Sequence, residues 1–390
     1  MRKLIFVIAV MLVSSVYGQA PLPPKKTGKA KPAASTPAAE APVSKTAASD
    51  ISAVVRVFNQ WGYIDKTGKY VINLQFDDAK PFSGNLARIK KSRDWGYIDA
   101  KGTYIINPQF DRAEDFSEGL ARVVKFREWG YIVKSGIFAI NPQFNDAGDF
   151  IDGIAIVRKG SQWGIIDTKG NFVVNPQFAE LAQFSEGLAR ARLGREWGYI
   201  DRAGKWIINP QFNEASDFDG DLACVRKGGD WGYIDKSGTF SINPQFEDAG
   251  NFFNGLARAK KMRQWGYIDK KGTWIINPQF DDAGDFAEGL ARVRKGREWG
   301  FIDASGSYSI NPQFDNAENF NGGIARVRKG TQWGFIGKTG NYVINPQFDL
   351  AHEFINGFSL IRKGTKWGFI NSTGNIVIDC TFHEAEDFSK

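Results

Sequence analysis

Apolar and polar residues alternate in short runs along most of this chain, and the runs recur at a fixed interval. A Trp-Gly pair begins each copy, and successive pairs are always 34 residues apart. Ten such lengths account for residues 51–390 without an insertion. A fixed period of this size is typical of solenoids, propellers and other repeat arrays. The pairs begin at Trp61, Trp95, Trp129, Trp163, Trp197, Trp231, Trp265, Trp299, Trp333 and Trp367.

One copy, residues 265–298, contains three runs with the composition and alternation of β-strands. They are Trp265–Asp269, Thr273–Asn277 and Leu290–Lys295, and each is bounded by turn residues. Pro278 is expected to end the second strand, because proline cannot donate a hydrogen bond to a central ladder. The pattern therefore predicts an all-β fold of ten three-stranded units.

Aromatic and glycine positions that recur in every copy indicate how the units are built. Two phenylalanines, Phe280 and Phe286 in this copy, lie in the connection between the second and third runs. Because a phenylalanine can bury on the order of 150–250 Å², we expect them to pack between neighbouring units. Asp269 and Gly272 flank a hairpin turn in which the glycine position favours positive φ.

The two ends of the repeat region are complementary parts of one copy. Residues 51–60 supply the last ten residues of a repeat, and residues 367–390 supply the first 24. A closed, propeller-like ring lets the N-terminal strand complete the C-terminal unit and removes exposed strand edges. We therefore favour a closed ring, with an open β-solenoid as the alternative.

The tandem motif W-G-[YF]-I-D-x-x-G, followed by N-P-Q-F and G-L-A-R-V, resembles the bacterial WG-repeat family, also called the KWG-repeat family. The resemblance covers residues 51–390. It implies a β-rich repeat domain that is often exported. It offers no catalytic motif to carry over to this chain.

The first 50 residues differ in composition from the repeats. Residues 1–18 have the charged start and short apolar run of a signal peptide, with cleavage expected before Gln19. Residues 19–50 form a Pro/Ala/Lys-rich stretch that we expect to be a disordered linker. The repeat domain is then residues 51–390. These features predict an exported protein, periplasmic, outer-surface or secreted, with no membrane insertion after signal cleavage.

Charge and residue counts narrow the chemistry. The chain carries a net charge of +7, but without the leader the repeats hold 43 basic and 41 acidic residues, so a nucleic-acid partner is not expected. The two cysteines and two histidines offer little material for a metal site or a catalytic triad. Clustered carboxylates such as Asp281, Asp282 and Asp285 are interpreted as turn residues rather than a Ca²⁺ site. We therefore predict a protein that is not an enzyme and needs no cofactor.

A series of basic residues on the third strand is the strongest candidate for ligand binding. These residues lie five or seven positions before each Trp and share one strand face. They could bind a repetitive anionic polymer or an acidic protein surface with avidity. Alternatively, they pair across strands with the Asp four residues after each Trp, such as Asp269. The candidate ligand-binding residues are Arg158, Arg192, Arg226, Arg292, Arg294, Arg326, Arg328 and Arg362.

The leading functional hypothesis is a non-enzymatic scaffold that mediates protein–protein interaction at the bacterial cell envelope or exterior. The alternative is a lectin-like binder of cell-wall or surface polysaccharide. Near-equivalent shallow sites around the ring would favour the polysaccharide, and one arc that differs from the rest would favour a protein partner.

Overall fold

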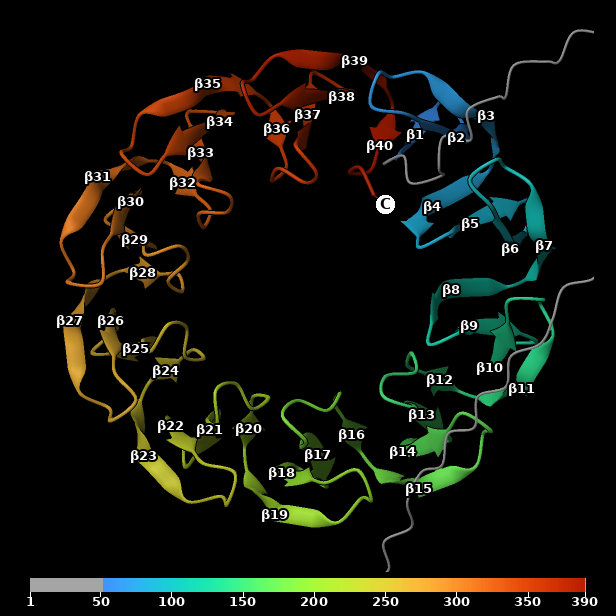
Figure 1. Ribbon diagram of the computed structural model, residues 1–390. Helices are drawn as coiled ribbons and strands as arrows, with labels where there is room; N and C mark the ends of the chain where they lie inside the picture. The colour runs from blue at the N-terminus through green and yellow to red at the C-terminus, as the bar shows by residue number, and fades with distance from the viewer. Residues whose placement is uncertain (1–51, 390) are drawn as a thin grey trace, which may run out of the picture. The chain divides into compact units, whose positions relative to one another are not determined.

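A computed structural model describes residues 52–389; the predicted signal peptide and linker lie outside the described residues. Residues 52–389 form ten four-stranded antiparallel sheets. The sheets stand as blades around a central opening, which makes the fold a ten-bladed β-propeller (Figure 1). The predicted closed ring is confirmed, and the open solenoid is wrong.

Each blade runs from the central opening outward through four strands. In one blade these are β28 (Asp282–Ala283), β29 (Ala291–Lys295), β30 (Glu298–Ile302) and β31 (Tyr308–Phe314). The innermost strand is the one that the sequence analysis missed, so the units have four strands rather than three. Two residues are too few to show an alternating pattern, and this strand becomes visible only through its pairing with β29.

The other blades follow the same order. The remaining innermost strands are β4 (Asp78–Ser83), β8 (Arg112–Ser117), β12 (Asp146–Ala147), β16 (Glu180–Leu181), β20 (Glu214–Ala215), β24 (Asp248–Ala249), β32 (Asn316–Ala317), β36 (Leu350–Ala351) and β40 (Glu384–Ala385). The remaining second strands are β1 (Ala53–Val57), β5 (Leu86–Lys91), β9 (Leu120–Lys125), β13 (Ile154–Lys159), β17 (Ala189–Leu193), β21 (Ala223–Lys227), β25 (Ala257–Lys261), β33 (Ile324–Lys329) and β37 (Phe358–Lys363). The remaining third strands are β2 (Gln60–Ile64), β6 (Asp94–Ile98), β10 (Glu128–Val133), β14 (Gln162–Asp167), β18 (Glu196–Ile200), β22 (Asp230–Ile234), β26 (Gln264–Ile268), β34 (Gln332–Gly337) and β38 (Lys366–Asn371). The remaining outer strands are β3 (Tyr70–Phe76), β7 (Tyr104–Phe110), β11 (Phe138–Phe144), β15 (Phe172–Phe178), β19 (Trp206–Phe212), β23 (Phe240–Phe246), β27 (Trp274–Phe280), β35 (Tyr342–Phe348) and β39 (Ile376–Phe382).

The ring closes through one blade built from both ends of the repeat domain. Its order is β3-β2-β1-β40, so the C-terminal part supplies the innermost strand and the N-terminal part supplies the other three (Figure 1). Val55 of β1 lies opposite Ala385 of β40. Ser52 and Ser389 exchange backbone hydrogen bonds of 3.0 and 2.9 Å. The complementary ends seen in the sequence therefore complete one sheet.

The expectation that proline ends a strand is wrong. Strand β27 continues through Pro278 to Phe280, as the equivalent outer strands do in other blades. The outer strand is an edge strand, and its pairing with β26 shifts register between Trp265 and Tyr267. A proline is tolerated at such a place, because no neighbouring strand requires its missing N–H.

The same irregularity explains the glycine of every Trp-Gly pair. A Cβ atom on Gly266 would lie 2.4 Å from the Ile276 carbonyl oxygen and 2.7 Å from the Pro278 nitrogen. The outer strand thus crosses directly over this glycine, and no side chain fits beneath it. The sequence analysis had no physical reason for this glycine.

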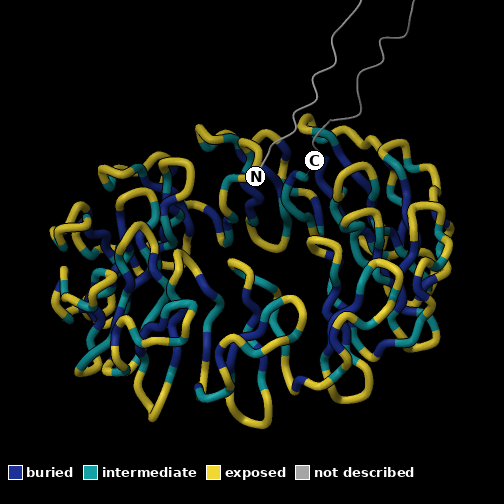
Figure 2. Tube along the Cα trace, turned by 60° about the horizontal axis from the view of Figure 1, so that its bottom comes forward, coloured by how far each residue is buried: buried dark blue, intermediate teal, exposed yellow. Residues whose placement is uncertain are grey.

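Hydrophobic cores lie between the blades. In one of them, Trp265, Tyr267 and Phe280 of one blade pack against Phe286 and Val293 of the next. The predicted packing of the two phenylalanines between units is therefore confirmed. Figure 2 shows the resulting pattern, with buried residues along the strands and exposed residues at the turns.

A buried tyrosine adds a hydrogen bond between blades. The Tyr267 hydroxyl donates to the Gly284 carbonyl oxygen of the next blade over 2.7 Å. Burial raises the pKa of Tyr267 well above its usual value, so the hydroxyl keeps the proton that it donates. Equivalent bonds join Tyr63 to Lys80, Tyr97 to Glu114, Tyr131 to Gly148, Tyr199 to Ser216 and Tyr233 to Gly250.

Candidate interaction surfaces

The candidate arginines seven positions before a Trp join one blade to the next. Arg292 of β29 donates to the Ala317 carbonyl oxygen over 2.7 Å and lies 3.4 Å from the Glu318 carboxylate. Its guanidinium also covers the Trp299 ring, 5.1 Å from the centroid. Arg326 makes the same kinds of contact, with the Ala351 carbonyl oxygen, Glu318 and Trp333.

The candidate arginines five positions before a Trp pair within their own blade. Arg294 lies 5.9 Å from the Trp299 ring centroid and 3.8 Å from the Asp282 carboxylate on the innermost strand. Such a guanidinium is already engaged by a ring and a carboxylate. Equivalent contacts join Arg158 to Asp146 and Trp163, Arg192 to Glu180 and Trp197, Arg226 to Glu214, Arg328 to Trp333, and Arg362 to Trp367.

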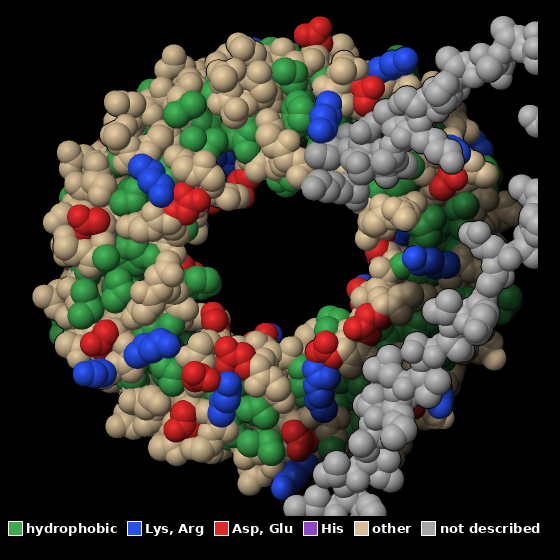
Figure 3. Space-filling view, viewed as in Figure 1, with side chains coloured by type: hydrophobic (Ala, Val, Ile, Leu, Met, Phe, Trp, Pro, Cys, Tyr) green, Lys and Arg blue, Asp and Glu red, His purple; other side chains and the backbone are tan. Residues whose placement is uncertain are grey.

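The alternative pairing with the Asp four residues after each Trp is wrong. The register places Arg292 opposite Phe301 and Arg294 opposite Trp299. The Asp269 carboxylate instead accepts hydrogen bonds from the backbone N–H groups of Lys271 and Thr273, over 2.9 and 2.8 Å. These aspartates therefore close the turns. In Figure 3, acidic and basic side chains lie beside one another around the opening.

The inter-blade arginine and its acidic partner are replaced together. The partner lies 27 residues later in the pairs Arg88–Asp115, Arg122–Asp149, Arg190–Asp217 and Arg258–Asp285, at distances of 2.7, 2.8, 2.9 and 3.0 Å. At the same spacing, Ile156 faces Gln183 in sequence and Cys224 faces Asn251. Burial raises the pKa of the Cys224 thiol to about 12, and its sulfur lies 3.8 Å from the Ala249 carbonyl oxygen. Paired replacement is typical of a structural contact. Ligand binding by the eight candidate arginines stays a prediction.

Replacing Arg190 with isoleucine should lower the free energy of unfolding by about 1–2 kcal/mol, because Asp217 and the Ala215 carbonyl lose their charged donor. Adding Asp217→Gln should recover about half of that loss, since Ile156 and Gln183 occupy these positions elsewhere in the ring. Urea denaturation followed by circular dichroism measures both changes. Equal stability of Arg190→Ile and the parent would contradict the structural role.

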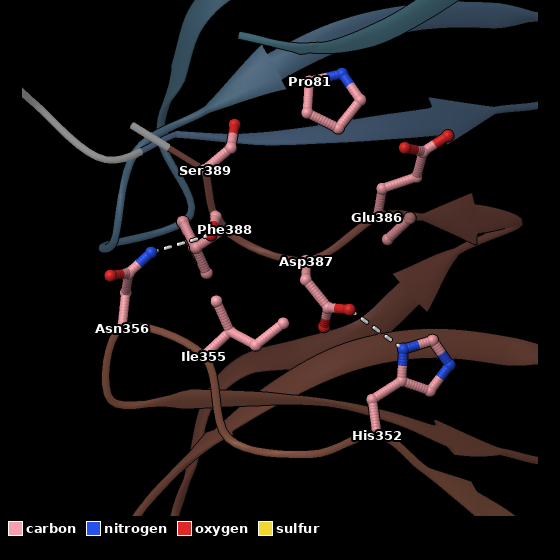
Figure 4. A pocket seen from close by; sticks show the side chains of 9 residues that line it. Pro81, His352, Ile355, Asn356, Glu386, Asp387, Phe388 and Ser389 are labelled. Atoms are coloured by element: carbon pink, nitrogen blue, oxygen red, sulfur yellow. Dashed lines mark hydrogen bonds and ion pairs between the residues drawn. The ribbon is translucent and has the colours of Figure 1, made fainter. Parts of the chain in front are cut away.

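The seam where the last blade meets the closing blade holds an open cavity of about 500 Å³. We call it the closure-seam cavity. Figure 4 shows its lining side chains, which come from the ends of three innermost strands. The lining residues are Pro81, His352, Ile355, Asn356, Ala385, Glu386, Asp387, Phe388 and Ser389.

Polar groups at this cavity are only partly used. His352 Nδ1 lies 3.1 Å from Asp387 Oδ2, and Asn356 donates to the Phe388 carbonyl oxygen over 3.0 Å (Figure 4). Leu360 stands 27 residues before Asp387, in place of the usual arginine, so His352 takes over as its partner. Within residues 52–389, Asp387 Oδ1 and Ser389 Oγ are buried without a hydrogen-bond partner. This cavity can therefore accept both an apolar group and hydrogen-bond donors.

The opposite end of the ring carries a second distinctive surface, which we call the tip surface. It consists of the turns between the second and third strands of the blades. Six copies have a glycine at one position of this turn, with φ between 60° and 67°. Phe58, Phe126 and Met262 occupy the same position with φ of 52°, 56° and 53°, and they are 74%, 81% and 83% exposed. The tip surface comprises residues 57–60, 91–94, 125–128, 159–162, 193–196, 227–230, 261–264, 295–298, 329–332 and 363–366.

Family and structure comparisons agree with this architecture. The family model for the WG-containing repeat matches ten segments: 61–92, 95–125, 129–163, 163–195, 197–229, 231–261, 265–297, 299–330, 333–367 and 367–390. The chain belongs to the WG-repeat family. No curated protein matches the sequence of this WG-repeat chain.

Solved structures similar to the WG-repeat ring share little sequence with it. A crystal structure of a eukaryotic initiation factor has 10% identity and a TM-score of 0.51, over 86% of this chain and 98% of that chain. Hsv2p of Kluyveromyces lactis has 8% identity and a TM-score of 0.35, over 58% of this chain and 92% of that chain. PorZ of Porphyromonas gingivalis has 11% identity and a TM-score of 0.26, over 82% and 56%. The first of these similarities supports the propeller fold alone.

Two searches of the WG-repeat ring concern other kinds of site. Among residues 52–389, no cluster of three or more His, Cys, Asp or Glu side chains is arranged to hold a metal ion. The same residues contain no helix with the length and apolar character needed to span a bilayer. The candidate surfaces are therefore the closure-seam cavity and the tip surface.

Proposed function

We propose that this protein is an exported, non-enzymatic scaffold that binds a protein partner at the bacterial cell envelope or exterior. The observation that carries the proposal is the closure-seam cavity. It lies where the ring departs from its own repeat, with His352 and Leu360 in place of the usual residues. The export part of the proposal rests on the leader sequence.

The lining of the cavity suits a loop or terminal segment of a protein. Ile355 and Phe388 offer apolar contact, and Asp387 and Ser389 offer unused hydrogen-bonding atoms to backbone or side-chain donors. Recognition of a peptide segment commonly combines one apolar anchor with a few directed hydrogen bonds. The cavity is the distinctive arc that favours a protein partner over a polysaccharide.

The repeated residues support a scaffold rather than a catalyst. Glu186 accepts backbone hydrogen bonds from Gly220 and Asp221 of the neighbouring blade, over 2.8 and 3.1 Å. A hydrogen bond from the Lys236 side chain lowers the pKa of Glu186. Carboxylates used in this way hold turns of adjacent blades together, which is the task of a rigid frame that presents variable surfaces.

Capture from a bacterial envelope extract on the immobilised chain tests the proposal. The bound material should disappear when the extract is first treated with protease. Ile355→Ser should weaken capture about ten-fold, since one buried apolar anchor contributes at least ~1.4 kcal/mol. Ile151→Ser, at the equivalent position of another blade, is the matched control and should leave capture unchanged. Capture that survives protease would contradict a protein partner and indicate a glycan or lipid.

A further inference from the structure

The tip surface carries large apolar side chains where the backbone favours glycine. A bulky residue in the left-handed region is an outlier that costs of order 1 kcal/mol or more. Phe58, Phe126 and Met262 accept this conformation and extend into solvent, each more than 70% exposed. Leu193, one position earlier in its turn, is 52% exposed. These side chains contribute little to the cores, so their presence at the tips indicates a role outside the folded ring.

The same turns are strongly basic. Together they hold 14 Lys and Arg residues against five Asp and Glu residues. Five exposed arginines are adjacent to or near the apolar tips, and none of the ion pairs found among residues 52–389 includes them. Nearby carboxylates are turned to the backbone, as where Asp281 accepts from the Gly296 N–H over 2.6 Å. The five are Arg93, Arg127, Arg195, Arg263 and Arg297.

The arrangement of the tips determines which partner fits. Each apolar tip belongs to a different blade, and at least one blade with a smaller tip residue separates successive members. Hot spots for a protein partner usually cluster near the centre of an interface. Here the anchors are spread around one end of a ring, so a broad, flat partner contacts several of them together.

We infer that the tip surface docks on an anionic lipid bilayer. Apolar tips enter the boundary between headgroups and acyl chains, while lysines and arginines lie at the level of the anionic headgroups. The docking is peripheral and requires no spanning segment. It also leaves the closure-seam cavity free, because β37 begins beside the Ile355–Gly357 turn at the cavity and ends at the tip turn on the opposite end of the blade.

Vesicle flotation of the full chain tests this inference. Vesicles of phosphatidylcholine with phosphatidylglycerol should bind the parent protein, and vesicles of phosphatidylcholine alone should bind it at least ~10-fold more weakly. Added salt should also weaken binding. The leader is present in every variant, so differences between variants report on the ring.

Three tip substitutions copy the residue that six other repeats already carry. The triple variant Phe58→Gly, Phe126→Gly and Met262→Gly keeps a backbone-compatible residue and should lose at least ~10-fold in vesicle binding. Its matched control changes three exposed apolar residues at the other end of the blades to residues found there in other copies. The control substitutions are Ile137→Thr, Ile151→Ser and Phe253→Ser, and they should leave vesicle binding unchanged.

The charge of the tips is tested separately. Arg93→Gln, Arg127→Gln and Arg263→Gln together should weaken binding to anionic vesicles, whereas Lys101→Gln, Lys134→Gln and Lys169→Gln should not. A parent chain that does not float with anionic vesicles overturns the inference. So does a glycine triple variant that binds as the parent does, or one that loses protein capture but not vesicle binding.

Discussion

Replacing Gly266 with alanine should lower the free energy of unfolding by about 3 kcal/mol or more. The new Cβ atom would lie 2.4 Å from the Ile276 carbonyl oxygen, and the obstacle is backbone rather than a flexible side chain. The outer strand must therefore move away from β26, which disturbs the cores on both sides of the blade. Urea denaturation followed by circular dichroism measures the change.

Gly337→Ala is the matched control for this substitution. Gly337 also lies in the third strand of a blade, and the nearest atom to its added Cβ is a Val343 side-chain carbon at 3.7 Å. We expect its stability to change by no more than ~0.5 kcal/mol. Similar stabilities for the two alanine variants would show that the outer strand does not constrain the Trp-Gly position.

Replacing Val55 with aspartate should open the ring. Val55 is fully buried in β1, opposite Ala385, and packs in a cluster with Leu360 and Phe388. An unpaired carboxylate there costs several kcal/mol, and it falls on the seam that joins the two ends of the repeat domain. Small-angle X-ray scattering should show a larger radius of gyration than that of the parent protein.

Val71→Asp provides the comparison for ring opening. Val71 lies on β3, the outer strand of the same blade, and is 47% exposed. A carboxylate at this position stays hydrated, so the scattering curve should match that of the parent. An unchanged radius of gyration for Val55→Asp would mean that β1 does not hold the ring closed.

Much of the fold could be predicted because the same physical constraints recur ten times. The complementary ends, residues 51–60 and 367–390, are visible in the sequence, and the backbone pairs them in one blade. The innermost strand could not be predicted, since two residues such as Asp282–Ala283 carry no periodic signal. Pro278 was misinterpreted because a sequence does not state which strand lies at an edge.

The candidate site was harder to predict than the fold. Repetition drew attention to arginines such as Arg292 and Arg294, and the structure engages both of them within the ring. Phe58, Phe126 and Met262 could have been found from the sequence, because they replace a glycine seen in six other copies. The closure-seam cavity could not, because ring closure alone brings Pro81 beside residues of the C-terminal blade.

The central claim is that function resides where the repeats differ, at the closure-seam cavity and the tip surface. One envelope capture series with the parent chain, Ile355→Ser and the glycine triple variant tests it most directly, with protein and lipid quantified in each bound fraction. The account predicts that Ile355→Ser loses protein but keeps lipid, and that the glycine triple variant loses lipid but keeps protein. Equal amounts of protein and lipid on all three chains would contradict it.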